Sequence, residues 1–173
     1  LIVDAALTAA GQELVHGASL IEPRSGLAVL IVVPSGGGKT TTALALARGG
    51  FRLMSDDASV LLPDRVSPRI WGMPRMLKVH RRTADLLPWV GPLTDKWDEN
   101  GEQGVSLESI GDRIAIAEPG PVALGAIILL GPRASGGSRV APLAKSEILT
   151  AIAHDNVAWR PAGMTPKAVR RFE

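Results

Sequence analysis

Hydrophobic residues occur along this chain in short runs that are rich in the β-branched residues favoured by strands. The run AVLIVV at residues 28–33 is continuous, which is typical of a strand buried on both faces. Shorter runs predict further strands. We expect them at residues 14–21, 51–55, 58–62, 113–117 and 123–130, with an edge strand at residues 139–142.

Polar positions divide the rest of the chain into helices and loops. Residues 39–48 place apolar side chains at positions 43, 44, 46 and 47, and two glycines follow, so a helix that ends at Arg48 is predicted. Helical spacing also predicts helices at residues 79–90 and 144–154. The polar sequence DKWDENGEQG at residues 95–104 predicts a mobile loop, and PRASGGS at residues 132–138 predicts another.

The order of these elements predicts an α/β fold. The strand at 28–33, a glycine-rich loop, the helix at 39–48 and the next strand form a βαβ unit, whose strands should be parallel. The later strands lack alternating helices, so we expect a mixed β-sheet rather than an open doubly wound one. No repeat or long linker divides the chain, which predicts one domain over residues 1–173. The sequence starts at Leu1 and ends in what reads as a basic helix, so we expect trimmed ends.

A glycine-rich loop joins the buried strand to its helix. Residues 33–40, VPSGGGKT, fit the phosphate-binding template G-x-x-x-x-G-K-[ST] except at the first position, where Val33 replaces glycine. Glycines let successive N–H groups point at one anion, and the helix N-terminus adds positive charge. A flexible Gly-Ser loop is the alternative, but the buried strand and the Gly-Lys-Thr junction favour a nucleotide site. The stiff valine predicts a slightly altered start of the loop.

The template assigns roles to the residues of this loop. Lys39 would reach the β- and γ-phosphates of ATP, and the Thr40 hydroxyl would complete the ligand shell of Mg²⁺. ATP and Mg²⁺ are therefore the predicted cofactors. The residues predicted to contact the nucleotide are Ser35, Gly36, Gly37, Gly38, Lys39, Thr40 and Thr41.

Two adjacent carboxylates, Asp56 and Asp57, follow the strand that comes directly after the helix of the loop. Because parallel strands end at the same edge of a sheet, we expect both side chains beside the phosphates. One carboxylate can hold magnesium, and the other can accept a proton from a hydroxyl that attacks the γ-phosphate. Ser-Asp-Asp is also common in turns. Next to a phosphate loop, a functional pair is favoured.

Three stretches together resemble the catalytic domain of the HPr serine kinase/phosphorylase family, whose nucleotide core is similar to that of phosphoenolpyruvate carboxykinase. They are His16-Gly17, the phosphate loop and RGGFRLMSDD at residues 48–57. The resemblance covers residues 14–62 and extends more weakly through residues 71–78 and 123–128. It implies a P-loop kinase core with a mixed sheet, assembly into homo-oligomers, and transfer of the γ-phosphoryl group of Mg-ATP to a serine hydroxyl of a peptide or small protein.

The resemblance also implies a role for each matching residue. Lys39 and the amides of the three loop glycines bind phosphate, and Thr40 binds magnesium. Asp56 is the base for the serine hydroxyl, Asp57 assists with the metal, and His16 lies near the transferred phosphate. Without the resemblance, His16 would be read as a partly buried histidine with a backbone partner.

The chain departs from the family pattern in two ways. Thr40-Thr41 stand where the family has serine and glutamate, and the family segment Glu-Ile-Arg-Gly-Leu-Gly is absent from the sequence. These departures disfavour phosphorylase activity and disfavour HPr as the substrate. The chain looks closer to divergent kinases that act on serine in ribosomal peptide pathways such as those of lasso peptides. A small-molecule alcohol kinase and a nucleotide-binding regulator without phosphotransfer remain alternatives.

Two cations follow the acidic pair along the chain. Arg75 and Lys78 are candidates for phosphate contacts, although surface salt bridges are the commoner use of such residues.

Composition narrows the classes of partner. A net charge of +2 and an aromatic content of 3% do not suggest a nucleic-acid partner or a base-stacking platform. The chain has no cysteine, which excludes disulfides and cysteine-zinc sites and fits a cytoplasmic location. No apolar run approaches the ~18 residues of a membrane helix, so no membrane partner is expected.

Overall fold

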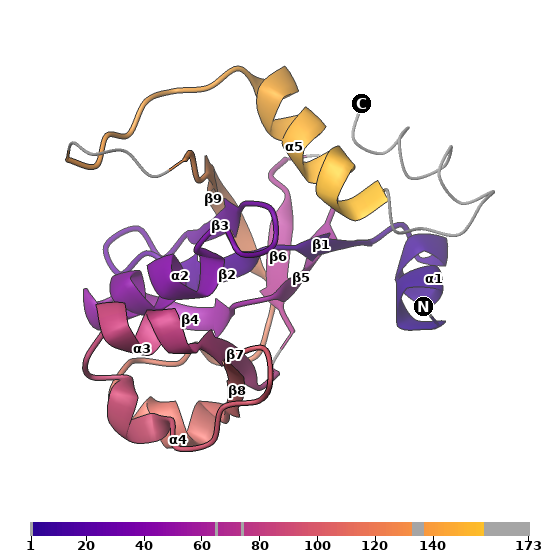
Figure 1. Cartoon of the computed structure of the whole chain (residues 1–173). Helices are drawn as coiled ribbons and strands as arrows, with labels where there is room; N and C mark the ends of the chain where they lie inside the picture. The colour runs from indigo at the N-terminus through magenta and orange to yellow at the C-terminus, as the bar shows by residue number, and fades with distance from the viewer. Residues whose placement is uncertain (1, 65, 74, 133–136, 158–173) are drawn as a thin grey trace.

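A computed structural model describes residues 2–64, 66–73, 75–132 and 137–157 (Figure 1). The basic stretch near the C-terminus that reads as a helix lies outside these residues. Within the described ranges, no helix combines the length and the apolar character that crossing a membrane requires.

Seven strands of the described chain form one mixed sheet in the order β1-β5-β6-β9-β3-β2-β4. The expected α/β class with a mixed sheet is therefore confirmed. The strands are β1 (Glu13–His16), β2 (Ala18–Ile21), β3 (Ala28–Val32), β4 (Arg52–Ser55), β5 (Ala58–Leu62), β6 (Arg69–Gly72) and β9 (Val122–Leu129).

The strand of the phosphate loop, β3, lies between β9 and β2. It pairs with β9 in parallel and with β2 in antiparallel register. The expectation that β3 and β4 are parallel neighbours is wrong, because β2 lies between them and pairs antiparallel with both. The two strands still run in the same direction, so their carboxyl ends share one edge of the sheet.

A glycine breaks the strand that was expected at residues 14–21 into β1 and β2. A Cβ at Gly17 would lie 2.6 Å from Leu30 Cδ1 and 3.0 Å from the Ile31 carbonyl oxygen, so a larger residue would have to displace the Leu30 side chain and would crowd the backbone of β3. The Gly17 N–H donates to the Asp57 carbonyl at 3.0 Å, where the chain passes from β4 into β5. Two long strands thus run side by side and bend together, at Gly17 and at the acidic pair.

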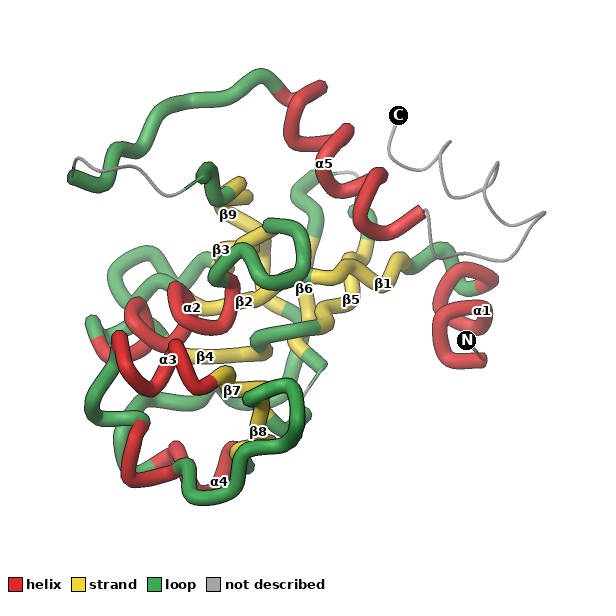
Figure 2. Tube along the Cα trace, in the orientation of Figure 1, coloured by secondary structure: helices red, strands yellow, loops and turns green. Residues whose placement is uncertain are grey.

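Helices cover the two faces of the sheet (Figure 2). Helix α2 (Lys39–Arg48) has the predicted bounds and packs Ala43, Leu44 and Ala47 into one core cluster. Helix α5 (Lys145–Val157) packs Ile152 into a second cluster that contains Leu30 and Val32. Adjacent residues of β3 point to opposite faces, so its continuous apolar run is explained by burial on both sides.

The other described elements surround this core. They are α1 (Ile2–Ala9), β7 (Leu77–His80), α3 (Arg81–Leu86), the 3₁₀ turn η1 (Gly91–Leu93), β8 (Glu102–Val105) and α4 (Leu107–Gly111). Strands β7 and β8 form a separate two-stranded antiparallel sheet.

The prediction of a helix at residues 79–90 is wrong at both ends, because α3 begins at Arg81 and ends at Leu86. His80 belongs to β7, and its Nδ1 accepts a hydrogen bond of 3.1 Å from the Arg82 N–H, which caps α3. The polar stretch at 95–104 is also more ordered than its composition suggests. Asp98 Oδ1 accepts from the N–H groups of Asn100 and Glu102, and this turn leads into β8.

Two expected strands are absent from the described chain. Residues 113–117 make one isolated bridge, from Ile116 to Leu53, because the N–H groups of Arg113 and Ile114 bond back to the Ile110 carbonyl at the end of α4. Residues 139–142 have no strand partner. Their apolar composition alone does not supply a neighbour for pairing.

Candidate functional site

The phosphate loop is held open by glycines at three successive positions. Gly36 and Gly38 have φ angles of 77° and 98°, which side-chain-bearing residues rarely adopt. Gly37 is needed for a different reason. A Cβ there would overlap Val33 Cγ2 and would lie 2.9 Å from the Pro34 carbonyl oxygen.

Val33 therefore has a packing role at the position where the template has glycine. Its side chain is buried and lies directly beneath Gly37. The Gly37 N–H donates to the Pro34 carbonyl at 2.9 Å, which closes a tight turn over the valine. Packing of Gly37 against Val33 therefore gives the loop a defined shape.

The pairing of strands brings His16 and the acidic pair to the carboxyl end of β3. Ala18 pairs with Ile31, so the chain just before β2 lies at that edge. Ser19 pairs with Ser55, so Asp56 follows at the same edge. This is the edge at which ligands of sheets with parallel strands bind.

Lys39, the first residue of α2, reaches His16. Its Nζ lies 2.7 Å from His16 Nε2, although the lysine is only 9% exposed. The same ring nitrogen lies 3.1 Å from Oδ1 of Asp57. The predicted phosphate-binding lysine, histidine and second aspartate therefore form one connected group.

Thr40 and Asp56 form a second contact next to the first. The Thr40 hydroxyl donates to Asp56 Oδ2 at 3.2 Å. Asp56 is 2% exposed, and its burial, together with the charge of Asp57, raises its pKa to about 6. The hydrogen bonds from Thr40 and from the Lys78 backbone oppose this rise of the pKa.

The pKa values of the two aspartates move in opposite directions. The hydrogen bond from His16 is the largest cause that lowers the pKa of Asp57, and the charges of His16, Lys39 and Arg75 act in the same direction. Burial of Asp57 opposes this effect. Asp57 therefore stays ionised at neutral pH, while Asp56 is the carboxylate that is closer to exchanging a proton.

The oxygens at this edge suit a magnesium ion that also binds phosphate. Thr40 Oγ1 and Asp56 Oδ2 are hard oxygen ligands 3.2 Å apart. Within the described residues, no group of three or more His, Asp and Glu side chains could hold a metal by itself. Magnesium in nucleotide sites needs only one or two protein oxygens beside phosphate and water, so the residues present fit it.

The remaining predicted residues lie at varied distances from this group. Ser35 is exposed on the loop, while the Thr41 hydroxyl is 2.8 Å from the hydroxyl of Thr83 on α3. Lys78 Nζ lies 3.8 Å from Glu102 Oε2, so the surface ion pair that was the alternative for Lys78 is present. Arg75 is exposed, and its charge acts on Asp57.

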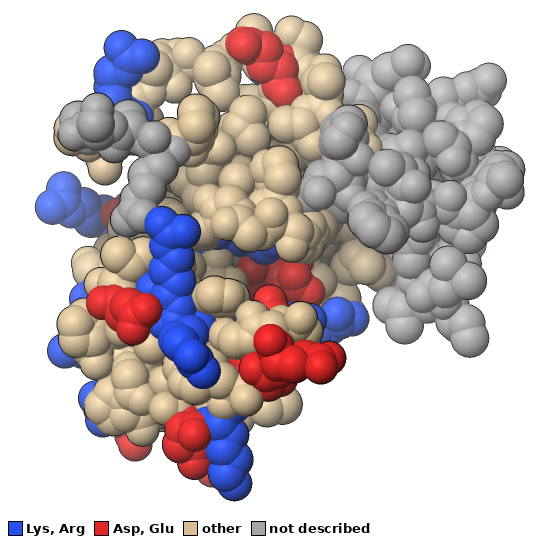
Figure 3. Space-filling view, viewed as in Figure 1, with Lys and Arg blue, Asp and Glu red and all other residues tan. Residues whose placement is uncertain are grey.

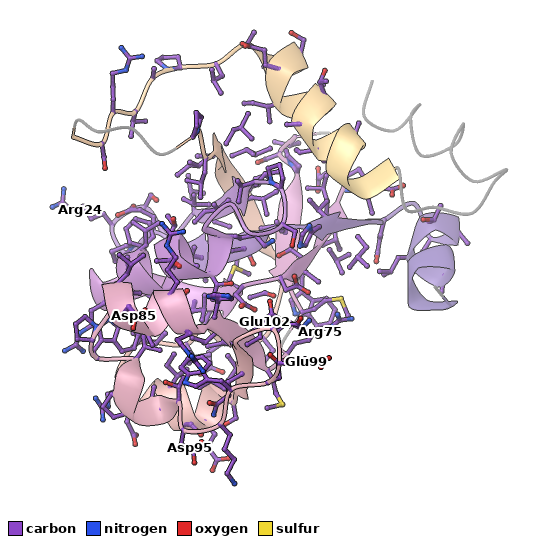
Figure 4. The ribbon with its side chains drawn as sticks, in the orientation of Figure 1. Arg24, Arg75, Asp85, Asp95, Glu99 and Glu102 are labelled. Atoms are coloured by element: carbon purple, nitrogen blue, oxygen red, sulfur yellow. The ribbon has the colours of Figure 1, made fainter. Side chains whose placement is uncertain are left out.

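The space-filling view shows charged side chains on one face of the molecule (Figure 3). Figure 3 shows acidic and basic side chains together in a recess near the middle of that face. Figure 4 labels Arg75, Glu99 and Glu102 in one region of this view.

Sequence reasoning missed the polar groups that support the bend. Ser59 donates to the Ser19 hydroxyl at 2.9 Å and contacts the Gly17 carbonyl at 3.4 Å, and Ser19 and Ser59 are fully buried. In the sequence, the only indication of these groups was a serine inside each of two apolar strands. Thr83 gave no signal, because its partner Thr41 lies on a different helix.

Comparison with known proteins gives no assignment for this chain. No model of a protein family matches it, and no curated protein matches it at a significant level.

Proposed function

We propose that this protein binds Mg-ATP through the phosphate loop and transfers the γ-phosphoryl group to a serine hydroxyl of a peptide or small protein. The observation that carries the proposal is one cluster at the end of β3. In it, Lys39 contacts His16 at 2.7 Å and Thr40 contacts Asp56 at 3.2 Å, beside two glycines with positive φ. The resemblance of residues 14–62 to the HPr kinase family supports the same chemistry.

In this proposal, each residue acts on a stated part of the reaction. The loop amides and Lys39 would bind phosphate oxygens, and Thr40 and Asp57 would hold the magnesium. Magnesium, when bound, neutralises charge that develops on the phosphate oxygens. Lys39 leaves His16 to reach the nucleotide, because a buried ammonium gains more from a charged phosphate than from a ring nitrogen.

Asp56 is the base in this scheme. Its pKa, raised to about 6, lies close to neutral pH, where a base both exists as carboxylate and has a useful affinity for the proton. The serine O–H bond breaks as the hydroxyl oxygen forms a bond to the γ-phosphorus, the proton passes to Asp56, and ADP leaves. Two carboxyls with pKa values pushed apart fit this division of roles.

The test is a thermal shift series with ATP, ADP and AMP, each with and without magnesium, on the wild type and on Lys39→Ala. A nucleotide that binds only the folded state stabilises it by ~2.7 kcal/mol at a hundredfold excess over its dissociation constant. We expect magnesium-dependent shifts with ATP and ADP, little shift with AMP, and none in Lys39→Ala. No shift of the wild type with any nucleotide would refute the proposal.

A further inference from the structure

A cavity of about 530 Å³ lies at the carboxyl ends of β3 and β9, and the mechanism above does not use it. Val33, which follows β3, and Leu129, which ends β9, line its floor. Pro34 of the phosphate loop lines one side. The first two turns of α5 also line it, with Thr150 and Ala151 among the lining residues.

The cavity and the acidic pair lie on opposite sides of the phosphate loop. Strand β3, from which the loop leaves the sheet, has β9 on one side and β2 on the other. His16 and Asp56 lie on the β2 side, and Lys39 and Thr40 point toward them. A triphosphate whose γ-phosphate faces Asp56 therefore leaves its other end toward β9, where the cavity is.

The lining suits a flat, largely apolar group. Most of it is formed by aliphatic side chains and Pro34, and its volume is in the range of about 300–1,000 Å³ that is usual for small-molecule sites. Two of the three polar side chains in the lining already have partners. Glu147 accepts from the Ala144 N–H at 3.1 Å, and the Thr150 hydroxyl donates to the Ser146 carbonyl at 2.8 Å.

We infer that this cavity holds the nucleoside of the nucleotide whose phosphates the loop binds, an inference that rests on the proposed function. Because few polar groups are left to read the edge of a base, the cavity accepts purines with weak selection. ATP and GTP are expected to bind with dissociation constants within about tenfold of each other, a difference of ~1.4 kcal/mol.

The test separates nucleoside binding from phosphate binding. Affinities for Mg-ADP and for magnesium tripolyphosphate, which has no nucleoside, are measured by titration calorimetry on the wild type, Thr150→Trp and Leu149→Trp. Thr150→Trp fills the cavity. Leu149→Trp is the matched control, because Leu149 is an exposed neighbour on the same helix that is not among the residues lining the cavity.

We expect Thr150→Trp to weaken the affinity for Mg-ADP by roughly tenfold or more and to leave the affinity for tripolyphosphate within about twofold of the wild type. Leu149→Trp should change neither affinity. If Thr150→Trp leaves ADP binding unchanged, the nucleoside site is wrong and the proposed function stands. If the wild type binds neither ligand, both the proposed function and this inference fall.

Photolabelling of the wild type gives a second measurement that does not depend on a folded variant. We expect 8-azido-ADP, photolysed with the magnesium-bound protein, to label residues 146–151 or 32–34, and excess tripolyphosphate to suppress the label. Labelling confined to any other segment would overturn the inference.

Discussion

Lys39 and Asp57 share a single nitrogen of His16. Nζ of Lys39 lies 2.7 Å from Nε2, and Oδ1 of Asp57 lies 3.1 Å from the same atom. An imidazole nitrogen either carries a proton and donates or lacks one and accepts. It accepts from Lys39 or donates to Asp57, so the two contacts compete.

This competition makes the ring of His16 a reporter of nucleotide binding. When Mg-ADP draws Lys39 to its phosphates, Nε2 is free to carry the proton and donate to Asp57. We expect the ¹⁵N signal of His16 Nε2 to shift further toward the protonated position on addition of Mg-ADP. Long-range ¹H–¹⁵N spectra measure this, and His16→Gln identifies the signal among the three histidines.

The Lys39→Ala variant is the control for this experiment. Without the lysine, Nε2 should show the protonated signal before any nucleotide is added. A wild-type signal that stays fixed at saturating Mg-ADP would mean that Lys39 does not leave His16.

The role of Asp56 as base can be separated from a role as magnesium ligand. Asp56→Asn keeps the shape of the side chain but cannot accept the proton of a serine hydroxyl. Positioned bases contribute about 10²–10⁴-fold to rate, so we expect a loss of phosphotransfer in that range with little change in Mg-ADP affinity. Transfer of radiolabelled phosphate from ATP to serine peptides, together with ADP titration, measures both.

The contact between Thr40 and Asp56 suggests the alternative role, in which Asp56 binds magnesium. If Asp56→Asn instead removes the magnesium dependence of ADP binding, Asp56 is the metal carboxylate. Transfer at a near-normal rate would also contradict the assignment as base.

Burial of Asp56 also predicts a stability effect with a definite sign. Its pKa is raised from 3.8 to about 6, so between these values the folded state binds more protons than the unfolded state. The free energy of unfolding contributed by this group therefore falls as pH rises from about 4 to 6. In metal-free buffer at pH 7, Asp56→Asn should stabilise the protein, by at most about 3 kcal/mol for roughly two pKa units.

Asp57→Asn is the matched comparison, because the pKa of Asp57 is lowered. Its ionised form stabilises the folded state above its unfolded pKa, and this contribution is lost as pH falls through the folded value. We expect Asp57→Asn to destabilise the protein at pH 7. Urea unfolding at pH 4 and pH 7 tests both signs, and a pH-independent effect of Asp56→Asn would show that its burial does not perturb the carboxyl.

The packing of Val33 under Gly37 predicts a specific requirement in the phosphate loop. Gly37→Ala would force its Cβ into Val33 Cγ2, so the turn must open and the amides must turn away from the phosphates. We expect Mg-ADP affinity to fall by roughly tenfold or more, that is by at least ~1.4 kcal/mol. Adding Val33→Ala to this variant removes the overlapping methyl group and should restore part of the affinity.

Gly111→Ala is the control, because no atom lies within 4 Å of a Cβ placed there and its φ is not positive. It should bind ADP like the wild type. Normal binding by Gly37→Ala would show that the loop shape is not required.

Local sequence patterns predicted the elements that carry the candidate site. The apolar run of β3 and the glycines around α2 act over a few residues, so their bounds could be read directly. The acidic pair was expected at the correct edge of the sheet, although for a reason that was only half right. Strand direction decides that edge, and β2 between β3 and β4 does not change it.

The failures concern partners that lie far away in the sequence. Strand β6 was not expected, because residues 69–72 lack a long apolar run and are fixed by pairing with β5 and β9. Gly72 lies so close to Met54 that a Cβ would be 2.6 Å from its backbone carbon. Residues 113–117 had strand composition, but the end of α4 uses two of their N–H groups.

The parallel pairing of β3 with β9 has a consequence for the protein during its synthesis. A ribosome releases β3, the phosphate loop and the acidic pair well before residues 122–129 emerge. Until then, one side of an entirely apolar strand has unpaired backbone groups, a condition that promotes association with other chains. The nascent protein should therefore depend on chaperones most strongly in the interval before β9 leaves the exit tunnel.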